Sequence, residues 1–170
     1  MSKILISGYY GFANAGDEAM LTAIIESLRQ VEKNVELTVL SGNPEDTAAK
    51  HQVCSVYRFN PLGIIRAMKD SELIISGGGS LLQDVTSKRS LLYYLSIIGL
   101  GKFFGKKVML FAQGIGPIRA KWARKLTSLV CNEVDLITVR DSESAVELIE
   151  MGVKPEKITV TADSVLSLNP

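Results

Sequence analysis

Histidine and cysteine are scarce in this sequence of 170 residues, which contains a single histidine, His51, and two cysteines, Cys54 and Cys131. Two cysteines far apart in the chain provide neither a disulfide framework nor the ligand spacing of a metal site, and they fit a reducing compartment. No Ser–His–Asp arrangement or metal-binding cluster is visible either. The sequence therefore argues against a disulfide-stabilised secreted scaffold and gives no indication of a metal cofactor.

The sequence also lacks a strong net charge and a membrane-length apolar run. Its formal net charge is +1, so no global field favours a nucleic-acid partner. The uncharged, mainly apolar stretch 90–101 has twelve residues, fewer than the roughly 20 that span a bilayer. Met1 is followed almost at once by a predicted strand, without the pattern of a signal peptide. We therefore expect a cytoplasmic protein without a transmembrane segment.

Basic residues are nonetheless distributed unevenly along the chain. Between Val85 and Asn132 there are nine basic residues and no acidic one. Such a segment can face an anionic surface or substrate, or it can form the solvated faces of surface helices. Solvated helix faces are the simpler interpretation, and the sequence leaves both open.

Apolar runs and helical patterns alternate throughout. Short runs of β-branched and aliphatic residues are typical of parallel strands covered on both faces. They predict strands at 3–7, 35–40, 53–57, 72–76, 107–112, 135–139 and 157–161. Helical patterns predict helices at 17–33, 61–69, 90–104, 121–132 and 141–152, and an outer helix carrying His51. The helix at 90–104 is apolar nearly all round, which predicts burial between layers.

This alternation predicts the α/β class. We expect a doubly wound, mostly parallel, Rossmann-like sheet with right-handed crossovers, forming a single domain over residues 1–170. In such a sheet the ligand crevice opens at the carboxyl ends of the strands, where the strand order reverses.

Three loops expected at that edge are rich in glycine, at 8–18, 77–84 and 113–117. One such loop can simply make a tight turn, whereas three at the same edge favour a binding site. The sequence has no GxxxxGK[ST], which rejects a Walker-type phosphate loop. It also has no GxGxxG after the first strand, which weakens the case for dinucleotide binding.

Several residues of the first two loops are candidates for substrate contact. Tyr10 and Phe12 can stack on sugar faces or line an apolar wall, although core packing of one of them is an alternative. Asn14 and Asp17 either contact substrate or cap the helix that follows. Successive N–H groups in Gly77, Gly78 and Gly79 can form an anion nest beside a helix start.

Two further candidates follow the fifth and sixth predicted strands. Gln113 opens the third glycine-rich loop. Arg140 has a planar guanidinium fork suited to carboxylate or phosphate, or it forms a surface ion pair with Asp141 or Glu143. His51 is expected on an outer helix away from this edge, as a surface histidine.

Five motifs in this order resemble the polysaccharide pyruvyl transferase family, and most closely its bacterial cell-wall members. The resemblance covers essentially the whole chain, and its specificity comes from the five motifs together. They are SGYYGFANAGDEAML at 7–21, LIISGGGSLLQD at 73–84, AQGIGP at 112–117, TVRDSES at 138–144 and TADSVLSL at 161–168.

This resemblance implies an enzyme that transfers a pyruvyl group from phosphoenolpyruvate to a sugar as a cyclic ketal, with release of phosphate. It implies a lipid-linked cell-wall polysaccharide precursor as acceptor, and hence peripheral association with the inner face of the cell membrane. It implies no cofactor besides the donor substrate. The family resembles a two-domain GT-B arrangement, with two Rossmann-like halves facing across a cleft.

By the same resemblance, Tyr10 and Phe12 line that cleft, the glycines 77–79 form its second loop, and Arg140 contacts the anionic donor or stabilises developing charge. Family members are much longer and carry a histidine and further basic residues in a second half. The chain thus resembles the N-terminal domain alone, which we expect to be inactive by itself. Because His51 is misplaced, the catalytic acid is expected in the C-terminal domain.

Two other interpretations stay open. One is the N-terminal half of a GT-B glycosyltransferase that uses a nucleotide sugar, and the other is a non-catalytic sugar- or nucleotide-binding module.

Overall fold

The structure is a computed structural model that describes residues 1–161. Of the five motifs, TADSVLSL falls almost wholly outside the described residues, as does the rest of 162–170. Seven parallel strands form one sheet in the order β3-β2-β1-β4-β5-β6-β7, so the order reverses between β1 and β4. The strands are β1 (Lys3–Ser7), β2 (Glu36–Ser41), β3 (Cys54–Tyr57), β4 (Leu73–Gly77), β5 (Lys107–Gln113), β6 (Leu136–Val139) and β7 (Ile158–Val160).

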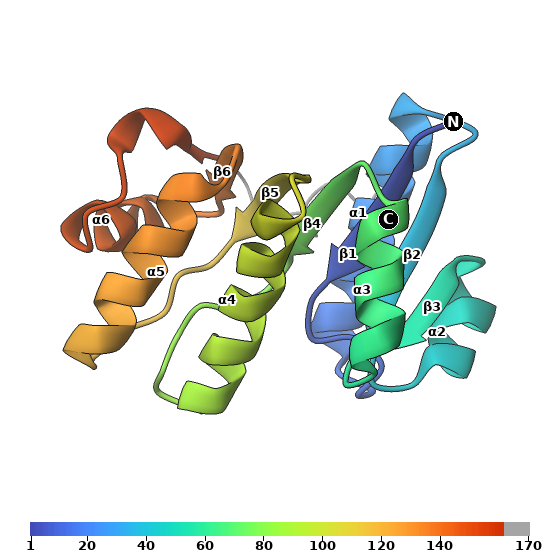
Figure 1. The fold of residues 1–170 in the computed structure, drawn as a ribbon, viewed down its shortest axis with the longest axis horizontal. Coiled ribbons are helices and arrows are strands. Elements are labelled where there is room, and N and C mark those ends of the chain that lie inside the picture. The colour runs from blue at the N-terminus through green and yellow to red at the C-terminus, as the bar shows by residue number, and fades with distance from the viewer. Residues whose placement is uncertain (162–170) are drawn as a thin grey trace.

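Helices connect successive strands and cover both faces of the sheet. In Figure 1, α3, α4 and α5 lie in front of the sheet and α1 lies behind it. The helices are α1 (Ala15–Val31), α2 (Pro44–His51), α3 (Pro61–Asp70), α4 (Lys88–Phe103), α5 (Lys121–Glu133) and α6 (Ser142–Glu150), followed by the short 3₁₀ helix η1 (Pro155–Lys157). The predicted doubly wound, Rossmann-like α/β fold is confirmed. Both ends of each predicted strand lie within one residue of the observed ends.

Alternation along the strands divides the core into two clusters. Leu5 and Ile74 point to the face covered by α3 to α6, whereas Ile6 and Ile75 point to the face covered by α1. All four side chains are at most 1% exposed. This alternation fixes the register of each strand, because a shift of one residue would place its apolar side chains on the opposite face of the sheet.

The prediction that α4 is buried between layers is wrong. Leu91 and Leu95 pack into the core, but Leu92 and Leu100 are each 38% exposed and Phe103 is 81% exposed. The sheet covers only one side of this helix, and nothing else in the described part of the chain covers the other. Within residues 1–161, no helix is both long enough and apolar enough to cross a membrane.

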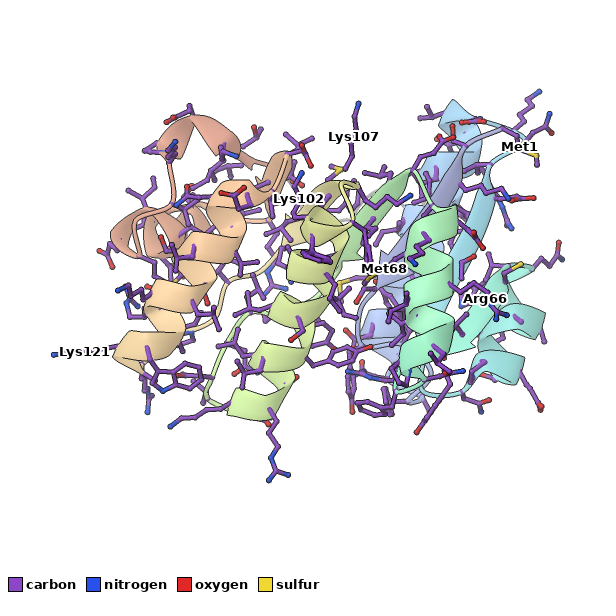
Figure 2. All side chains as sticks on the ribbon, viewed as in Figure 1. Met1, Arg66, Met68, Lys102, Lys107 and Lys121 are labelled. Carbon is purple, nitrogen blue, oxygen red and sulfur yellow. The ribbon has the colours of Figure 1, made fainter. Side chains whose placement is uncertain are left out.

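The nine basic residues of the segment 85–132 do not gather on one surface. Figure 2 shows Lys102 and Lys107 toward the amino edge of the sheet and Lys121 toward the opposite edge. The Lys102 ammonium also pairs with the Asp135 carboxylate at 2.7 Å. This spread supports solvated helix faces rather than a single anion-binding patch.

The exposed side of α4 gives a direct test of the packing. Replacing Leu91 with Ala removes a fully buried side chain and should lower the free energy of unfolding by about 2–5 kcal/mol. The neighbouring change Leu92→Ala should cost about 1 kcal/mol or less, because that side chain is partly in water. Urea denaturation of both variants measures the difference, and equal large losses would contradict the observed orientation of α4.

Candidate functional site

The loops that follow β1, β4, β5 and β6 meet at the carboxyl edge of the sheet, which is the lower edge in Figure 1. Leu82 and Ile115 form a parallel bridge between two of these loops. The Gly114 N–H donates to the Gly79 carbonyl oxygen at 3.1 Å. The three glycine-rich loops therefore share one edge, as the sequence predicted, and they are hydrogen-bonded to one another.

Tyr10 joins the first loop to the second. Its side chain is 1% exposed, and its hydroxyl donates to the Gly77 carbonyl oxygen at 2.6 Å. Burial raises the pKa of the phenol, and the neighbouring Asp17 raises it further, so Tyr10 remains a donor at neutral pH. Core packing was the alternative considered for Tyr10 or Phe12, and it applies to Tyr10. The buried side chain of Tyr10 packs beneath the loops of the carboxyl edge.

The exposed aromatic surface of the loop is made by Tyr9 and Phe12. Their side chains are 41% and 42% exposed, and their rings stack with centroids 4.4 Å apart and an interplanar angle of 13°. Gly42 lies beneath Phe12, where a Cβ would approach the ring to 2.6 Å. Phe12 thus lies at the edge as expected, and its partner is Tyr9, which sequence analysis missed. An irregular loop has no period that shows which of two adjacent tyrosines points inward.

Asn14 caps α1, because its Oδ1 accepts from the backbone N–H groups of Gly16 at 3.0 Å and Asp17 at 3.3 Å. The helix accordingly begins at Ala15, two residues before the predicted start. Asp17 is half-buried in the first turn, close to Gly79, where a Cβ would lie 3.0 Å from its Oδ1. Desolvation, followed by the charge of Glu18, raises the pKa of Asp17.

The glycines of the second loop make a turn rather than an open nest. Gly78 and Gly79 have φ values of 74° and 71°, in the left-handed region that favours glycine. The Gly78 N–H donates to the Phe111 carbonyl oxygen at 3.4 Å, and the Gly79 N–H donates to the sulfur of Met20 at 2.8 Å. Because both donors point into the protein, these two residues do not form the predicted anion nest.

Arg140 is fixed at the same edge by its neighbours. Its Nη2 donates to the Ser80 hydroxyl at 3.0 Å, and its Nε lies 3.5 Å from Asp141 Oδ2. Gly114 makes room for the guanidinium group, since a Cβ there would lie 2.7 Å from its Cζ. The anticipated ion pair with Asp141 is therefore present, and it holds Arg140 between the second and third loops. Ser80, its other partner, was not identified from the sequence.

Asp141 also fixes the start of α6. Its Oδ1 accepts from the backbone N–H of Ser144 at 2.7 Å, and hydrogen bonding by Ser144 lowers the pKa of the Asp141 carboxyl group. A carboxylate is thus favoured next to Arg140. Asp84 instead holds the segment just before α5, because its two carboxylate oxygens accept from the backbone N–H groups of Arg119 and Ala120.

Gln113 lies beneath the edge rather than on it. The side chain is fully buried, its Oε1 is 3.5 Å from the Ser76 hydroxyl, and its Nε2 has no hydrogen-bond partner within residues 1–161. A bulge at Ala112, whose φ is 45°, shifts the register just before Gln113. The sequence offered no sign of this bulge.

The expectation that His51 is a surface histidine is wrong. Its side chain is 9% exposed, and its Nε2 lies 3.3 Å from Glu18 Oε2. The other oxygen of Glu18 accepts from the backbone N–H of Gly11 at 2.9 Å. His51 therefore supports the first loop through Glu18. Within residues 1–161 no group of three or more His, Cys, Asp or Glu side chains can hold a metal ion.

The contact between Gly114 and Arg140 can be tested by adding a methyl group. In Gly114→Ala the new Cβ must displace the guanidinium group, the end of a flexible side chain, so we expect a stability change of about 1 kcal/mol or less. The Nε–H signal of Arg140 in an NMR spectrum, assigned with Arg140→Lys, should shift clearly. Gly99→Ala is the matched control, because a Cβ at Gly99 meets nothing within 4 Å. An unchanged Arg140 signal in Gly114→Ala would contradict the close packing.

Solved structures share this fold at low sequence identity. The HepE protein of Anabaena in complex with UDP and glucose has a TM-score of 0.64 at 12% identity, over 96% of this chain and 44% of that one. The UDP-GlcNAc 2-epimerase of Neisseria meningitidis bound to UDP-GlcNAc has a TM-score of 0.60 at 13% identity, over 98% and 47%. A glycosyltransferase from Rickettsia africae has a TM-score of 0.60 at 11% identity, over 95% and 42%. The chain spans less than half the length of these proteins, and such likeness shows the fold alone.

No curated protein matches the chain by sequence. The family model described as polysaccharide pyruvyl transferase matches residues 14–170, which include the second to fifth motifs and the last eight residues of the first. The chain therefore belongs to the polysaccharide pyruvyl transferase family.

Proposed function

We propose that this chain forms one half of an enzyme that transfers a pyruvyl group from phosphoenolpyruvate to a sugar as a cyclic ketal. The proposed acceptor is a lipid-linked precursor of a cell-wall polysaccharide, used at the inner face of the cell membrane. Family membership supports the transferase class. The observation that carries the choice of donor is Arg140, which the loops after β4, β5 and β6 hold at the carboxyl edge.

The proposed enzyme needs a second Rossmann-like half facing this edge, in a GT-B-like arrangement. Ligands of open parallel sheets bind outside the carboxyl ends of the strands, and the strand order reverses here between β1 and β4. The three similar structures are each more than twice as long as the part that this chain covers. We propose that the isolated chain is inactive because one wall of the cleft is lacking.

Phosphoenolpyruvate carries a carboxylate and a phosphate, and both require fixed donors. The Arg140 guanidinium group is suited to a carboxylate or a phosphate because its N–H groups form a planar fork. Ser80 and Asp141 orient this fork without covering it, since the Arg140 side chain is 33% exposed. Phe12 and Tyr9 provide a flat apolar surface on which an acceptor sugar can stack.

The remaining predicted substrate-binding residues act mainly as supports in this proposal. Tyr10 and the glycines 77–79 shape the edge, and Gln113 lies beneath it. Asn14 orients the first turn of α1, which presents the half-buried Asp17 carboxyl group beside Gly79.

The proposed reaction begins with protonation of the methylene carbon of phosphoenolpyruvate, which leaves an oxocarbenium-like centre on the neighbouring carbon. One sugar hydroxyl adds there and loses its proton, and a second then replaces phosphate to close the ketal. Arg140 stabilises the charge on the donor as phosphate departs. Since His51 is paired with Glu18 away from Arg140, we propose that a histidine of the second half donates the proton.

A nucleotide-sugar glycosyltransferase is the alternative with structural support. Of the similar structures, HepE is in complex with UDP and glucose, and the epimerase is bound to UDP-GlcNAc. The two functions differ in donor and in leaving group. A pyruvyl transferase releases inorganic phosphate from phosphoenolpyruvate, whereas such a glycosyltransferase releases a nucleotide from its sugar donor. A binding module would bind the acceptor and release neither product.

Arg140 provides the test of the donor assignment. In the full-length protein, with an acceptor glycan that supports turnover, Arg140→Ala should lower kcat/KM for phosphoenolpyruvate by about 10²–10³-fold, as expected when one donor to developing charge is lost. Arg140→Lys should recover only part of this loss, because lysine lacks the planar fork. Phosphate release measures the reaction.

Arg66→Ala is the control, since Figure 2 shows this labelled arginine on α3, outside the loops that hold Arg140. Its kinetics should match those of the unaltered enzyme. Unchanged kinetics in Arg140→Ala would refute the role of Arg140. Nucleotide release from a nucleotide sugar, with no phosphate release from phosphoenolpyruvate, would instead establish the glycosyltransferase.

A further inference from the structure

Arg58 is a buried cation with unused donors. It directly follows β3 and is 4% exposed. Its Nε and Nη1 have no hydrogen-bond partner within residues 1–161, and its Nη2 is 3.4 Å from the Tyr94 hydroxyl, which makes a weak bond. A buried charge is costly unless hydrogen bonds or an opposite charge compensate it. Arg58 therefore differs from Arg140, which has a carboxylate partner.

Aromatic rings supply part of that compensation. Five of them lie with their centroids 4.4–5.8 Å from the Arg58 Cζ, namely Tyr9, Phe12, Phe59, Tyr93 and Tyr94. A ring face attracts a cation, but it does not replace the oxygen acceptors that the N–H groups of a guanidinium bind in its own plane. Burial raises the pKa of Tyr93 to about 12 and also raises that of Tyr94, so neither phenol is an anion at neutral pH.

Arg58 also forms part of the wall of an apolar groove. The groove lies between α3 and α4, which stand next to each other in Figure 1, and it has a volume of about 290 Å³. Its other principal lining residues are Phe59, Ile64, Tyr93, Ile97 and Leu100. One cation thus lies against a groove that is otherwise almost entirely apolar.

We propose that this groove binds a hydrocarbon chain that ends in an anionic oxygen group, with the anion accepting hydrogen bonds from Arg58. The volume is near the lower limit for ligand pockets and suits a short chain or one segment of a longer one. Phe59 lies over Arg58, with its ring centroid 5.1 Å from the Arg58 Cζ, and it lines the groove. The Phe59 side chain is 60% exposed, so it has room to move. In this proposal Phe59 turns outward on binding, so that the unused donors of Arg58 reach the anion.

This proposal does not depend on the proposed transfer reaction, and its test requires no activity. Isotope-labelled protein with observable isoleucine methyl groups is titrated with decyl phosphate below its micelle concentration. Ile64 and Ile97 report occupancy of the groove. Decanol tests the chain without the charge, inorganic phosphate tests the charge without the chain, and decanoate shows whether a carboxylate serves as well as a phosphate.

We expect decyl phosphate to bind at least about tenfold more tightly than decanol, since charge-assisted hydrogen bonds are the strong ones. Arg58→Met, which removes the charge but keeps an apolar side chain, should abolish this difference. Leu100→Glu places a carboxylate on the groove wall and should weaken binding of decyl phosphate by about tenfold or more. Leu92→Glu is the matched control, because Leu92 is equally exposed on the same helix but does not line the groove.

Equal affinity for decyl phosphate and decanol in the unaltered protein would overturn the proposal, as would equal losses in Leu100→Glu and Leu92→Glu. Inorganic phosphate binding as tightly as decyl phosphate would also overturn it, because the apolar groove would then contribute nothing. If Arg58→Met fails to fold, the two leucine variants still decide the question.

Discussion

The hydrogen bond from Tyr10 to the Gly77 carbonyl oxygen is the contact on which the geometry of the carboxyl edge depends. It joins the loop after β1 to the end of β4, across the point where the strand order reverses. Because Tyr10 is drawn into the core, Tyr9 and Phe12 are left on the surface. Gly8 is required beside it, since a Cβ there would lie 2.4 Å from the Tyr10 ring. A 2.6 Å bond in a buried setting is expected to be stronger than its counterpart in water.

The positions of the other residues at the carboxyl edge depend on that contact. The left-handed turn at Gly78 and Gly79 places Ser80 at the surface, where its hydroxyl holds Arg140. Asp84 in the same loop accepts from the backbone N–H groups of Arg119 and Ala120, just before α5, and so joins the loops after β4 and β5. Arg140 therefore owes its position to the Ser80 hydroxyl and to close packing against Gly114 as well as to its ion pair with Asp141. Arg58 lies under the same aromatic pair, which means that Tyr9 and Phe12 contact both proposed sites.

The sequence predicted those features that follow from periodicity and topology. Short aliphatic runs located all seven strands of residues 1–161, and the rule for parallel sheets placed three separate glycine-rich loops at one edge. Properties that depend on the packing of a single side chain were not predictable. Tyr9 and Tyr10 are adjacent in an irregular loop, so only the folded core selects the one that turns inward. His51 was misjudged because its partner, Glu18, is 33 residues away. The outward face of α4 is apolar, and composition alone cannot distinguish such a face from a buried one.

The central claim is that Tyr10 ties the loop after β1 to the loop after β4, and hydrogen exchange of Tyr10→Phe tests it most directly. This change keeps the ring and removes the hydroxyl, leaving a buried carbonyl group short of a donor at a cost of about 1–3 kcal/mol. Amide exchange should become faster in both 8–14 and 77–84, whereas Tyr94→Phe should leave 77–84 unchanged. Faster exchange confined to 8–14, or no change in either loop, would contradict the claim.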